Sequence, residues 1–454
     1  MVKYHSSSSL TAIDGRNRNK LTSLIPYLSD LALDRERIKI ELAYLRKLAE
    51  YKLIRPLTVG EIGKLDELVK RFNEREYERV RKIERRTNHE MKAVEKYIQE
   101  TLNKTSMKDI AEMVHFGLTT DDVNNIAYSL IFKKALHKVL VPELTKILEL
   151  LKDSARKFKS LAMLSRTHGQ PAVPTTVGKE FLVYFKRLIE EVEALKKMEF
   201  RAKLTGNVGN LNAHKFLYPK INWLVFSREF IGEFGLTPDL ITTQIEPYDG
   251  LIKLFQTLLR TNNILKGLCI DFWIYVSFGY FRQTVIKNEV GSTALPHKVN
   301  PIYFEGAEGG FGVANVLLNF YSDKLSYSRL QRDLSDSTVR RSVPMAFGYC
   351  LLSYQSVSEA LRRIEPDTVK ISQDLENHKE ILSEAIQNFL RTRKYKEAYD
   401  KTKEFFRGKT ISKSEVNRFI ERLNISKDDK MILLKLSVSN YTGYSEELVG
   451  LYAK

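Results

Sequence analysis

The stretch LIKLFQTLLRTNNILKGLCIDFWIYVSFGYF, residues 251–281, decides the fold class of this chain. Apolar side chains occupy most of its positions, and its only charges are Lys253, Arg260, Lys266 and Asp271. A helix that is apolar on nearly every face has to be buried among other helices. The stretch therefore predicts a long helix inside an elongated helical bundle.

Further segments with the helical spacing of apolar residues lie on both sides of this stretch. The N-terminal part has the pattern from about Ile25 to Glu100, and longer periodic segments cover residues 123–158, 174–202 and 306–327. A segment of about thirty residues corresponds to a helix of roughly 45 Å. The chain has only 22 glycines and 12 prolines, which disfavours turn-rich β architectures. We therefore predict an all-α fold.

Three domains are predicted from this pattern. Residues 1–108 form an N-terminal helical domain, 109–361 a central bundle of long helices, and 362–454 a small helical C-terminal domain. The last boundary is placed where the composition becomes rich in Lys and Glu. An elongated bundle of this kind buries more apolar surface as an oligomer than one chain can cover alone.

The chain carries 73 basic and 56 acidic residues, a formal net charge of +17. Its lysines are interleaved with glutamates and do not cluster with aromatic residues, which disfavours a nucleic-acid partner. A polyanionic small substrate or a generally Lys-rich surface explains the charge better. The N-terminus MVKYHSSSSL has no apolar core, and no segment is typical of a membrane span. Cys269 and Cys350 lie in apolar stretches, as buried thiols in a reducing compartment do. We expect a cytoplasmic protein without a membrane partner.

The loop GSTALPHKVNP, residues 291–301, has the groups needed for acid–base chemistry. Ser292 supplies an oxygen that can exchange a proton, Lys298 supplies a positive charge, and Gly291 leaves backbone amides uncovered. Such a set can remove a proton from carbon and stabilise the negative charge that results. Taken alone, however, a Gly-Ser pair followed by a lysine is more often an ordinary polar surface loop.

Among the eight histidines, His168 is the strongest catalytic candidate. It lies in SRTHGQP, residues 165–171, a polar turn that we expect just before a long helix, where anions bind well. The alternative for a lone histidine near a helix end is a hydrogen-bonded structural role. No two histidines have the i, i+4 spacing of a metal site, and neither glycine-rich segment, 206–210 or 309–312, has the context of a nucleotide-binding loop. We expect no metal and no cofactor.

Two more polar segments are TTQIEP at 242–247 and the arginine-rich run at 328–341. Arginine guanidinium groups match phosphate and carboxylate oxygens in pairs, so the second segment is interpreted as an anion clamp. A helix end crossed by ion pairs is an equally good interpretation of the same residues.

With these segments in hand, the chain resembles the fumarase/aspartase superfamily of lyases. The three separated regions of the superfamily match HFGLTTDDVNN from His115, SRTHGQPAVPTTVGKE from Ser165 and GSTALPHKVNP from Gly291. Within the superfamily the chain is similar to the bacterial type of the adenylosuccinate lyase family. This narrower similarity rests on DGR at 14–16, TNHE at 87–90, GNVGNLNAH at 206–214, TTQIEP at 242–247 and QRDLSDSTVRR at 331–341.

The resemblance implies a fold and a reaction. The fold would be three helical domains whose long central helices form a twenty-helix core in a homotetramer, with each active site assembled from three chains. The reaction would be β-elimination of fumarate from adenylosuccinate to give AMP. The same site would cleave succinyl-aminoimidazole-carboxamide ribotide in purine biosynthesis.

The resemblance also implies roles for individual residues. Ser292 would be the general base that removes a proton from carbon, and His168 the general acid that protonates the departing purine nitrogen, with Lys298 stabilising the base. The residues that would bind the substrate are Arg16, Asn17, Asn88, His89, Glu90, Thr119, Thr120, Gln244, Asn300, Arg332, Ser337, Thr338 and Arg341.

Some positions depart from the family pattern without touching the acid or the base. They concern mainly the contacts to ribose and phosphate. The departures are Thr120 and Thr293 for serine, Leu295 for methionine, Glu90 for aspartate, Asn17 for tyrosine and Gly306 for asparagine.

Other functions explain less of the chain. Lyases that act on argininosuccinate, aspartate or malate share the three regions but bind no nucleotide, which leaves TTQIEP and the paired arginines unexplained. A structural protein that had lost catalysis would be expected to lack Ser292, His168 or Lys298, and all three are present.

Overall fold

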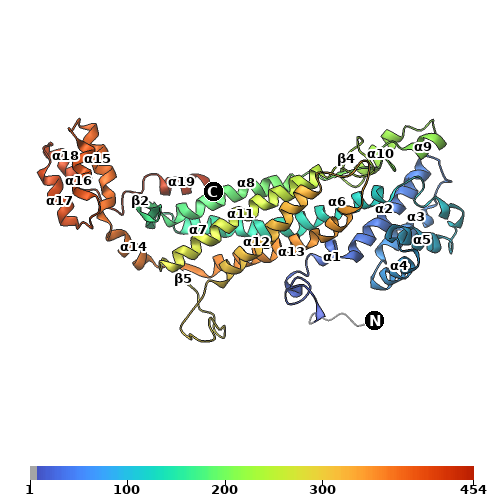
Figure 1. Cartoon of the computed structure of the whole chain (residues 1–454), viewed down its shortest axis with the longest axis horizontal. Helices are drawn as coiled ribbons and strands as arrows, with labels where there is room; N and C mark the ends of the chain where they lie inside the picture. The colour runs from blue at the N-terminus through green and yellow to red at the C-terminus, as the bar shows by residue number, and fades with distance from the viewer. Residues whose placement is uncertain (1–7, 454) are drawn as a thin grey trace. The chain divides into compact units, whose positions relative to one another are not determined.

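The computed structural model describes residues 8–453 and is predominantly helical with only short strands, which confirms the predicted all-α class (Figure 1). The α-helices are α1 (Ile25–Leu28), α2 (Asp30–Glu50), α3 (Val59–Lys70), α4 (Glu74–Thr87), α5 (Glu90–Leu102), α6 (Thr120–Ala135), α7 (Val141–Lys157), α8 (Val177–Lys196), α9 (Asn212–Leu217), α10 (Trp223–Gly232), α11 (Asp249–Ser277), α12 (Ile302–Lys324), α13 (Ser335–Arg362), α14 (Thr368–Glu376), α15 (Ser383–Thr392), α16 (Ala398–Phe406), α17 (Lys413–Arg422), α18 (Lys427–Leu434) and α19 (Ser445–Tyr452).

Short strands connect some of these helices. An antiparallel hairpin pairs β1 (Ala162–Thr167) with β2 (Gln170–Thr176), and a second antiparallel pair joins β5 (Phe281–Gln283) to β6 (Ile364–Pro366). The strands β3 (Arg201–Ala202) and β4 (Thr237–Pro238) pair in parallel.

The chain divides into two compact units. The first contains the described residues up to Glu143 together with 191–262 and 310–352, and the second contains 144–190, 263–309 and 353–453. The divisions fall inside α7, α8, α11, α12 and α13, so each of these helices contributes to both units.

Helix α2 is the centre of packing in the N-terminal part of the first unit. Ile38, Leu45 and Leu48 on this helix are completely buried. The ring of Tyr44 meets Phe226 and Phe230 of α10 edge-on, with centroids 5.8 and 5.7 Å apart. Burial of each such side chain contributes roughly 1.5–3 kcal/mol, so this core holds α2 and α10 in fixed positions.

In the second unit, a separate hydrophobic core lies among α14 to α18. It contains Ile386, Leu390, Ile420 and Val438, and Leu164 of β1 belongs to the same cluster. The β1–β2 hairpin is therefore anchored to the C-terminal helices through its first strand.

Helix α11 is the long helix that the stretch 251–281 predicts, but it ends at Ser277. Gly279 then adopts a left-handed backbone (φ +74°), which ends a helix readily because glycine has no Cβ. Leu254 and Leu265 are buried as expected, whereas Trp273 is 43% exposed. In the C-terminal half of α11, the described residues of a single chain bury Leu268 and Phe272 but leave Ile270 and Ile274 partly exposed.

The predicted helix over 174–202 begins only at Val177, because residues 170–176 form strand β2. Proline and the β-branched residues Val173, Thr175 and Thr176 favour an extended backbone over a helix. The segment 123–158, by contrast, is helical as far as Lys157, with one π-helical turn at Leu136–Leu140 between α6 and α7.

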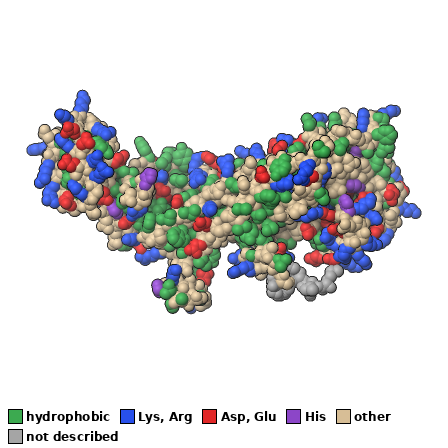
Figure 2. Space-filling view, in the orientation of Figure 1, with side chains coloured by type: hydrophobic (Ala, Val, Ile, Leu, Met, Phe, Trp, Pro, Cys, Tyr) green, Lys and Arg blue, Asp and Glu red, His purple; other side chains and the backbone are tan. Residues whose placement is uncertain are grey.

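Figure 1 shows a long loop without helix or strand between β5 and α12, which contains residues 291–301. Basic and acidic side chains are mixed over the visible face, in agreement with their interleaving in the sequence (Figure 2). Within residues 8–453, no helix has the length and apolar character needed to cross a membrane.

Candidate active site

A buried arginine joins the beginnings of α6 and α13 in the first unit. The Arg340 side chain is 2% exposed, and its Nη2 lies 3.0 Å from Asp121 Oδ1 and 3.0 Å from Asp336 Oδ2. The guanidinium also lies over the rings of Tyr128 and Tyr248, 4.9 and 5.4 Å from their centroids. Burial acts to lower the pKa of Arg340, but the surrounding acidic groups outweigh it and raise the pKa. The guanidinium therefore remains charged.

Asp336 is shared with a second arginine. Its Oδ2 accepts hydrogen bonds from Arg332 Nη1 at 3.0 Å and from the Tyr248 hydroxyl at 2.7 Å. Ser337 and Thr338 follow in the first turn of α13, where backbone N–H groups are directed toward the helix N-terminus. Arg332, Ser337 and Thr338 are thus grouped where an anion is favoured.

Arg341 is connected to the start of α5. It forms an ion pair with Glu90 Oε1, and the second oxygen of Glu90 accepts from Arg37 Nη2 at 2.8 Å. Arg37 is buried and also donates from Nε to Asn124 of α6 at 2.8 Å. This network brings the TNHE segment and the end of QRDLSDSTVRR together.

The other two candidates of the TNHE segment form the corner between α4 and α5. Asn88 ends α4 in the left-handed region (φ +51°). His89 is the N-cap of α5, where its Nδ1 accepts from the Lys92 amide at 3.2 Å. Both side chains are exposed.

The start of α6 is rigid. Thr119 is its buried N-cap, and the Thr119 amide donates to Asp122 Oδ2 at 2.9 Å, while Thr120 is partly exposed. Asp122 is completely buried and pairs with Lys203 at 2.9 Å. The end of α6 that carries Thr119 and Thr120 is therefore fixed by buried groups.

Backbone hydrogen bonds bring two more of the motif segments together. The Gln244 amide donates to the carbonyl of Gln331 at 3.2 Å, and Gln244 Nε2 donates to the carbonyl of Asn207 at 3.0 Å. A Cβ at Gly209 would lie 1.9 Å from the Thr242 carbonyl oxygen, and Gly209 has φ +86°. This close approach of the two backbones requires glycine.

Arg16 and Asn17 lie in the turn before a short 3-10 helix at Arg18–Lys20. The same N-terminal segment helps to line a cavity of about 360 Å³, through Ile13 and Arg18, together with Arg341 of α13. This volume is at the lower end of the range for small-molecule sites. The cavity therefore connects the N-terminal turn with the arginine-rich start of α13.

In the second unit, His168 and Gly169 form the two-residue turn of the β1–β2 hairpin. Their φ angles are +52° and +74°, as a type I′ turn requires, and His168 is exposed at the tip. Arg166 Nη2 pairs with Asp374 of α14 at 3.1 Å and fixes the hairpin. The expectation of a turn directly before a helix was wrong, because the seven residues of β2 separate the turn from α8.

The loop at 291–301 is stabilised by local hydrogen bonds. Ser292 Oγ accepts from the backbone amides of Ala294 and Leu295 at 3.3 and 3.0 Å. Asn300 Nδ2 donates to the Gly291 carbonyl at 2.8 Å. A Cβ at Gly291 would lie 2.0 Å from the Lys298 carbonyl oxygen, so the loop can close only with glycine there.

The first unit thus contains most of the predicted substrate-binding residues, and its contacts bring their segments together. The second unit contains His168, Ser292, Lys298 and Asn300. Among the described residues, no hydrogen bond or ion pair links His168, Ser292 and Lys298 to one another.

Comparison with known families agrees with the motifs. The profile of the family described as "Lyase" matches residues 27–314, and that described as "Adenylosuccinate lyase C-terminal" matches residues 328–442. The adenylosuccinate lyase of Legionella pneumophila strain Philadelphia 1 is 40% identical over 97% of this chain and 98% of its own length. This chain belongs to the adenylosuccinate lyase family.

Similar family members come from distant organisms. The adenylosuccinate lyase of Dictyostelium discoideum is 40% identical and that of Escherichia coli K12 is 37% identical, each over 97% of this chain and 98% of the relative. Two solved structures share the fold at 17% identity and a TM-score of 0.78. They are a fumarate lyase from Mesorhizobium sp. BNC1, with 95% of this chain and 97% of that chain covered, and the 3-carboxy-cis,cis-muconate lactonizing enzyme from Pseudomonas putida, with 95% and 96% covered.

Asp121, Asp336 and Arg340 lie within the quoted motifs of the adenylosuccinate lyase family, but the sequence did not predict them as site residues. The spacing of four residues between Asp336 and Arg340 was a visible signal for an ion pair along a helix. The contact with Asp121 had no such signal, because the two residues are far apart in the chain.

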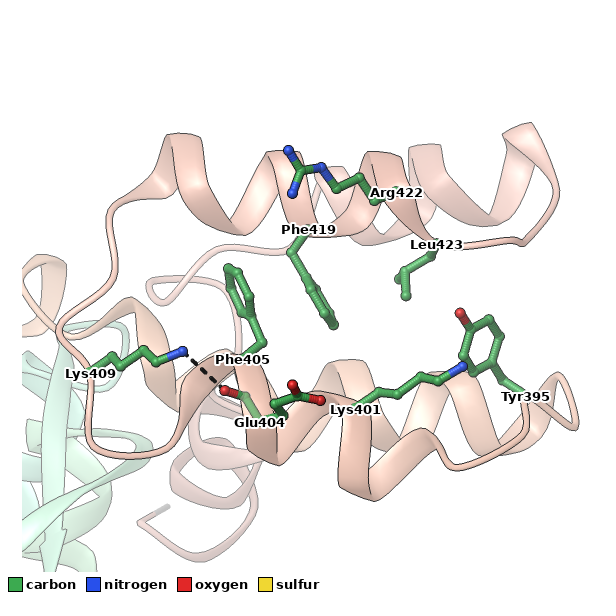
Figure 3. Close-up of a pocket in the computed structure, with 8 residues that line it drawn as sticks. All are labelled: Tyr395, Lys401, Glu404, Phe405, Lys409, Phe419, Arg422 and Leu423. Atoms are coloured by element: carbon green, nitrogen blue, oxygen red, sulfur yellow. Dashed lines mark hydrogen bonds between the residues drawn. The ribbon is translucent and has the colours of Figure 1, made fainter.

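A further groove lies between α16 and α17 (Figure 3). Phe405 and Phe419 stack in it with centroids 4.4 Å apart, and Lys401, Lys409 and Arg422 are among its other lining residues. Its volume is about 350 Å³, and it contains no residue that the family resemblance assigns to the substrate.

His, Cys, Asp and Glu side chains are the candidate ligands for a metal ion. Over the described residues 8–453, no three His, Cys, Asp or Glu side chains are arranged to hold a metal ion. Within the same residues Cys269 and Cys350 form no disulfide, and both are buried as the sequence predicts.

Proposed function

We propose that this chain catalyses β-elimination of fumarate from adenylosuccinate to give AMP, and the same cleavage of succinyl-aminoimidazole-carboxamide ribotide. The observation that carries the proposal is a set of contacts within one unit. They join the segments that carry Gln244, Arg332 and Arg341 to the start of α6, which carries Thr119, and Arg341 also lines a cavity of small-molecule size. Membership of the adenylosuccinate lyase family supports the same reaction. The substrates are small molecules, and the reaction needs no cofactor.

In the proposed mechanism, Ser292 is the general base. Its oxygen, as the alkoxide, takes the proton from the succinyl carbon next to a carboxylate, and the negative charge moves onto that carboxylate. The charge then returns to form the carbon–carbon double bond of fumarate while the carbon–nitrogen bond breaks. The two amides that donate to Ser292 Oγ support its alkoxide, and the positive charge of Lys298 adds to this effect.

His168 is the proposed general acid. It delivers a proton to the purine nitrogen as the carbon–nitrogen bond breaks, so that the amine leaves in its neutral form. Its position at the exposed tip of a hairpin, on an anchored base, suits a group that reaches a substrate. Lys298 and Asn300 would also hold the succinyl carboxylates, with Thr119 and Thr120 beside them.

The phosphate and ribose would be held by arginines and by the first turn of α13. Guanidinium groups and helix N-terminal amides both favour a phosphate. The remaining proposed contacts fall on the N-terminal turn, the α4–α5 corner and the polar segment before α11. The residues are Arg16, Asn17, Asn88, His89, Glu90, Gln244, Arg332, Ser337, Thr338 and Arg341.

We further propose a cytoplasmic homotetramer with a twenty-helix core and active sites shared by three chains. The proposed domains are residues 1–108, 109–361 and 362–454. Exposed apolar side chains on the long helices support association, among them Trp273 on α11 (43% exposed) and Val316 on α12 (71% exposed). Neither nucleic acid nor a membrane is a proposed partner.

The assay that tests the reaction uses purified protein and adenylosuccinate. The ultraviolet absorbance of adenylosuccinate should change as AMP forms, and fumarate should appear in equal amount. The same should hold for the imidazole ribotide. Lack of turnover with both substrates would contradict the proposal.

The oligomer is tested separately. Light scattering after gel filtration should give the mass of four chains of 52.6 kDa each. Mixing and refolding Ser292→Ala with His168→Ala protein should restore part of the activity, because some shared sites would then receive both wild-type side chains. A monomeric mass, or mixtures as inactive as their components, would contradict shared sites.

A further inference from the structure

The buried position of Arg340 is an unusual place for a charge. Its Nη2 bridges Asp121 at the start of α6 and Asp336 at the start of α13. Removing a guanidinium from water is costly, and only well-placed partners compensate for it. The compensation is incomplete. Asp121 meets Arg340 as an ion pair only, and both Asp121 carboxylate oxygens, Asp336 Oδ1 and Arg340 Nε and Nη1 have no hydrogen-bond partner in the part of the chain that the structure describes.

An incompletely satisfied ionic cluster is a poor way to stabilise a core, since apolar side chains of similar size often do so as well or better. Its geometry, by contrast, is highly constrained. Tyr128 and Tyr248 place their rings against the Arg340 guanidinium, and the Tyr248 hydroxyl donates to the carboxylate that Arg340 contacts. The cluster therefore fixes the position of the Asp336 carboxylate.

The Asp336 carboxylate in turn holds Arg332. Arg332 Nη1 donates to the same oxygen, Oδ2, at 3.0 Å, and the Arg332 side chain is 19% exposed. Arg332 Nη1 is thus hydrogen-bonded to a buried carboxylate, while part of the side chain remains accessible to solvent. A guanidinium held in this way loses less freedom when it binds an anion than a free arginine does.

We propose that Arg340 is a positioning residue that acts through Asp336 to hold Arg332 ready for the phosphate of the substrate. Asp121 completes the arrangement by fixing Arg340 from the side of α6, next to Thr119 and Thr120. The inference rests on the proposed function, and it adds a residue that does not touch the substrate.

A double-mutant cycle on the full-length protein tests this role. Arg340→Met and Arg332→Met are each expected to raise KM for adenylosuccinate about 10- to 100-fold with a smaller change in kcat. If Arg340 acts through Arg332, adding Arg340→Met to Arg332→Met should change KM less than about threefold further. If the KM increases of the two single variants multiply in the double variant, the proposal is overturned.

Two more variants distinguish a positioning role of Arg340 from a role in folding alone. Arg340→Lys keeps the charge but lacks the planar guanidinium that lies over the rings of Tyr128 and Tyr248, so its ammonium should not hold the Asp336 carboxylate in the same position and KM should still rise. An unchanged KM in Arg340→Lys would overturn the proposal even if Arg340→Met fails to fold. Arg362→Gln is the matched control, because Arg362 lies at the C-terminal end of α13, is 51% exposed and lies 3.9 Å from Glu359, and its KM should equal that of the wild type.

The outcome for the wild type separates this inference from the proposed function. A wild-type protein that fails to turn over either ribotide would overturn both. If the wild type is active but the substitutions of Arg332 and Arg340 change KM independently, only the positioning role is overturned.

Discussion

The start of α13 and the loop at 291–301 carry charged or reactive side chains in opposite surroundings. At the start of α13, Arg340 and Asp336 are buried, and their partners come from distant parts of the sequence. In the loop, Lys298 is exposed, and Ser292 Oγ is contacted by amides two and three residues away. The difference teaches that one region has its shape set by the fold, while the other has its shape set by its own backbone.

The comparison predicts where function and stability separate. Substitutions in the loop should impair the reaction and leave folding intact. Substitutions in the buried region should affect folding, substrate affinity or both.

The largest effect is expected from the proposed acid and base. Ser292→Ala and His168→Ala should each lower kcat by about 10²- to 10⁴-fold, the usual contribution of general acid–base catalysis. Adenylosuccinate should still bind, because the proposed phosphate clamp is unchanged. Steady-state kinetics and calorimetric binding of the substrate measure the two quantities.

The side chains of Ser292 and His168 are accessible in the single chain. The Tm of Ser292→Ala and of His168→Ala should therefore stay within a degree or so of the wild-type value. An active Ser292→Ala protein would move the role of the base to another residue. If Tm falls together with activity, the contrast between the loop at 291–301 and the start of α13 does not hold.

Two glycine substitutions sharpen the contrast. In both positions a Cβ would meet a backbone oxygen, at 2.0 Å for Gly291 and at 1.9 Å for Gly209. Gly291→Ala should reduce kcat/KM by about 10- to 100-fold, since a displacement near 1 Å of a reacting group has that effect. Gly209→Ala should instead lower Tm by several degrees, because Gly209 has a positive φ and ties two segments of the first unit together.

Thermal unfolding and kinetics of both variants test this pair. Gly408→Ala provides a control for the positive φ alone, since a Cβ at Gly408 (φ +70°) meets no atom within 4 Å. If Gly291→Ala lowered Tm as much as Gly209→Ala, the loop would be part of the folded core.

The smallest effect concerns pH. Burial raises the pKa of Glu246, which lies close to Tyr248 in the first unit, to about 7 from an ordinary value of 4.5. A raised carboxyl pKa stabilises the fold at pH values below the unfolded pKa, and this stabilisation is lost as pH rises through the folded pKa. The contribution of Glu246 should therefore disappear between about pH 4.5 and 7.

Glu246→Gln removes this titration and retains an oxygen for the hydrogen bond from the Tyr248 amide. Its Tm should match that of the wild type near pH 5 and exceed it by a few degrees at pH 8. Glu421→Gln, at an exposed position, serves as the control and should follow the wild type throughout. A Glu246→Gln protein whose Tm runs parallel to the wild type from pH 5 to 8 would show that Glu246 does not titrate in this range.

Several features of this protein were determined by local sequence. The apolar pattern at 251–281 was sufficient for the long helix α11, because helical periodicity depends on neighbours three and four residues apart. The family was evident from its separated motifs, and comparison with relatives confirmed it. The hairpin at 162–176 was missed because a short strand with prolines has a weaker local signal than a long helix.

Other features were decided only by the tertiary structure. The sequence left open whether the run at 328–341 is an anion clamp or a helix end crossed by ion pairs, and the structure contains the ion pairs in a specific arrangement around Arg340. The pairing of Arg340 with Asp121 and of Arg341 with Glu90 joins residues hundreds of positions apart. No local pattern encodes such partners, because a buried charge acquires its partner only when packing brings distant segments of the chain together.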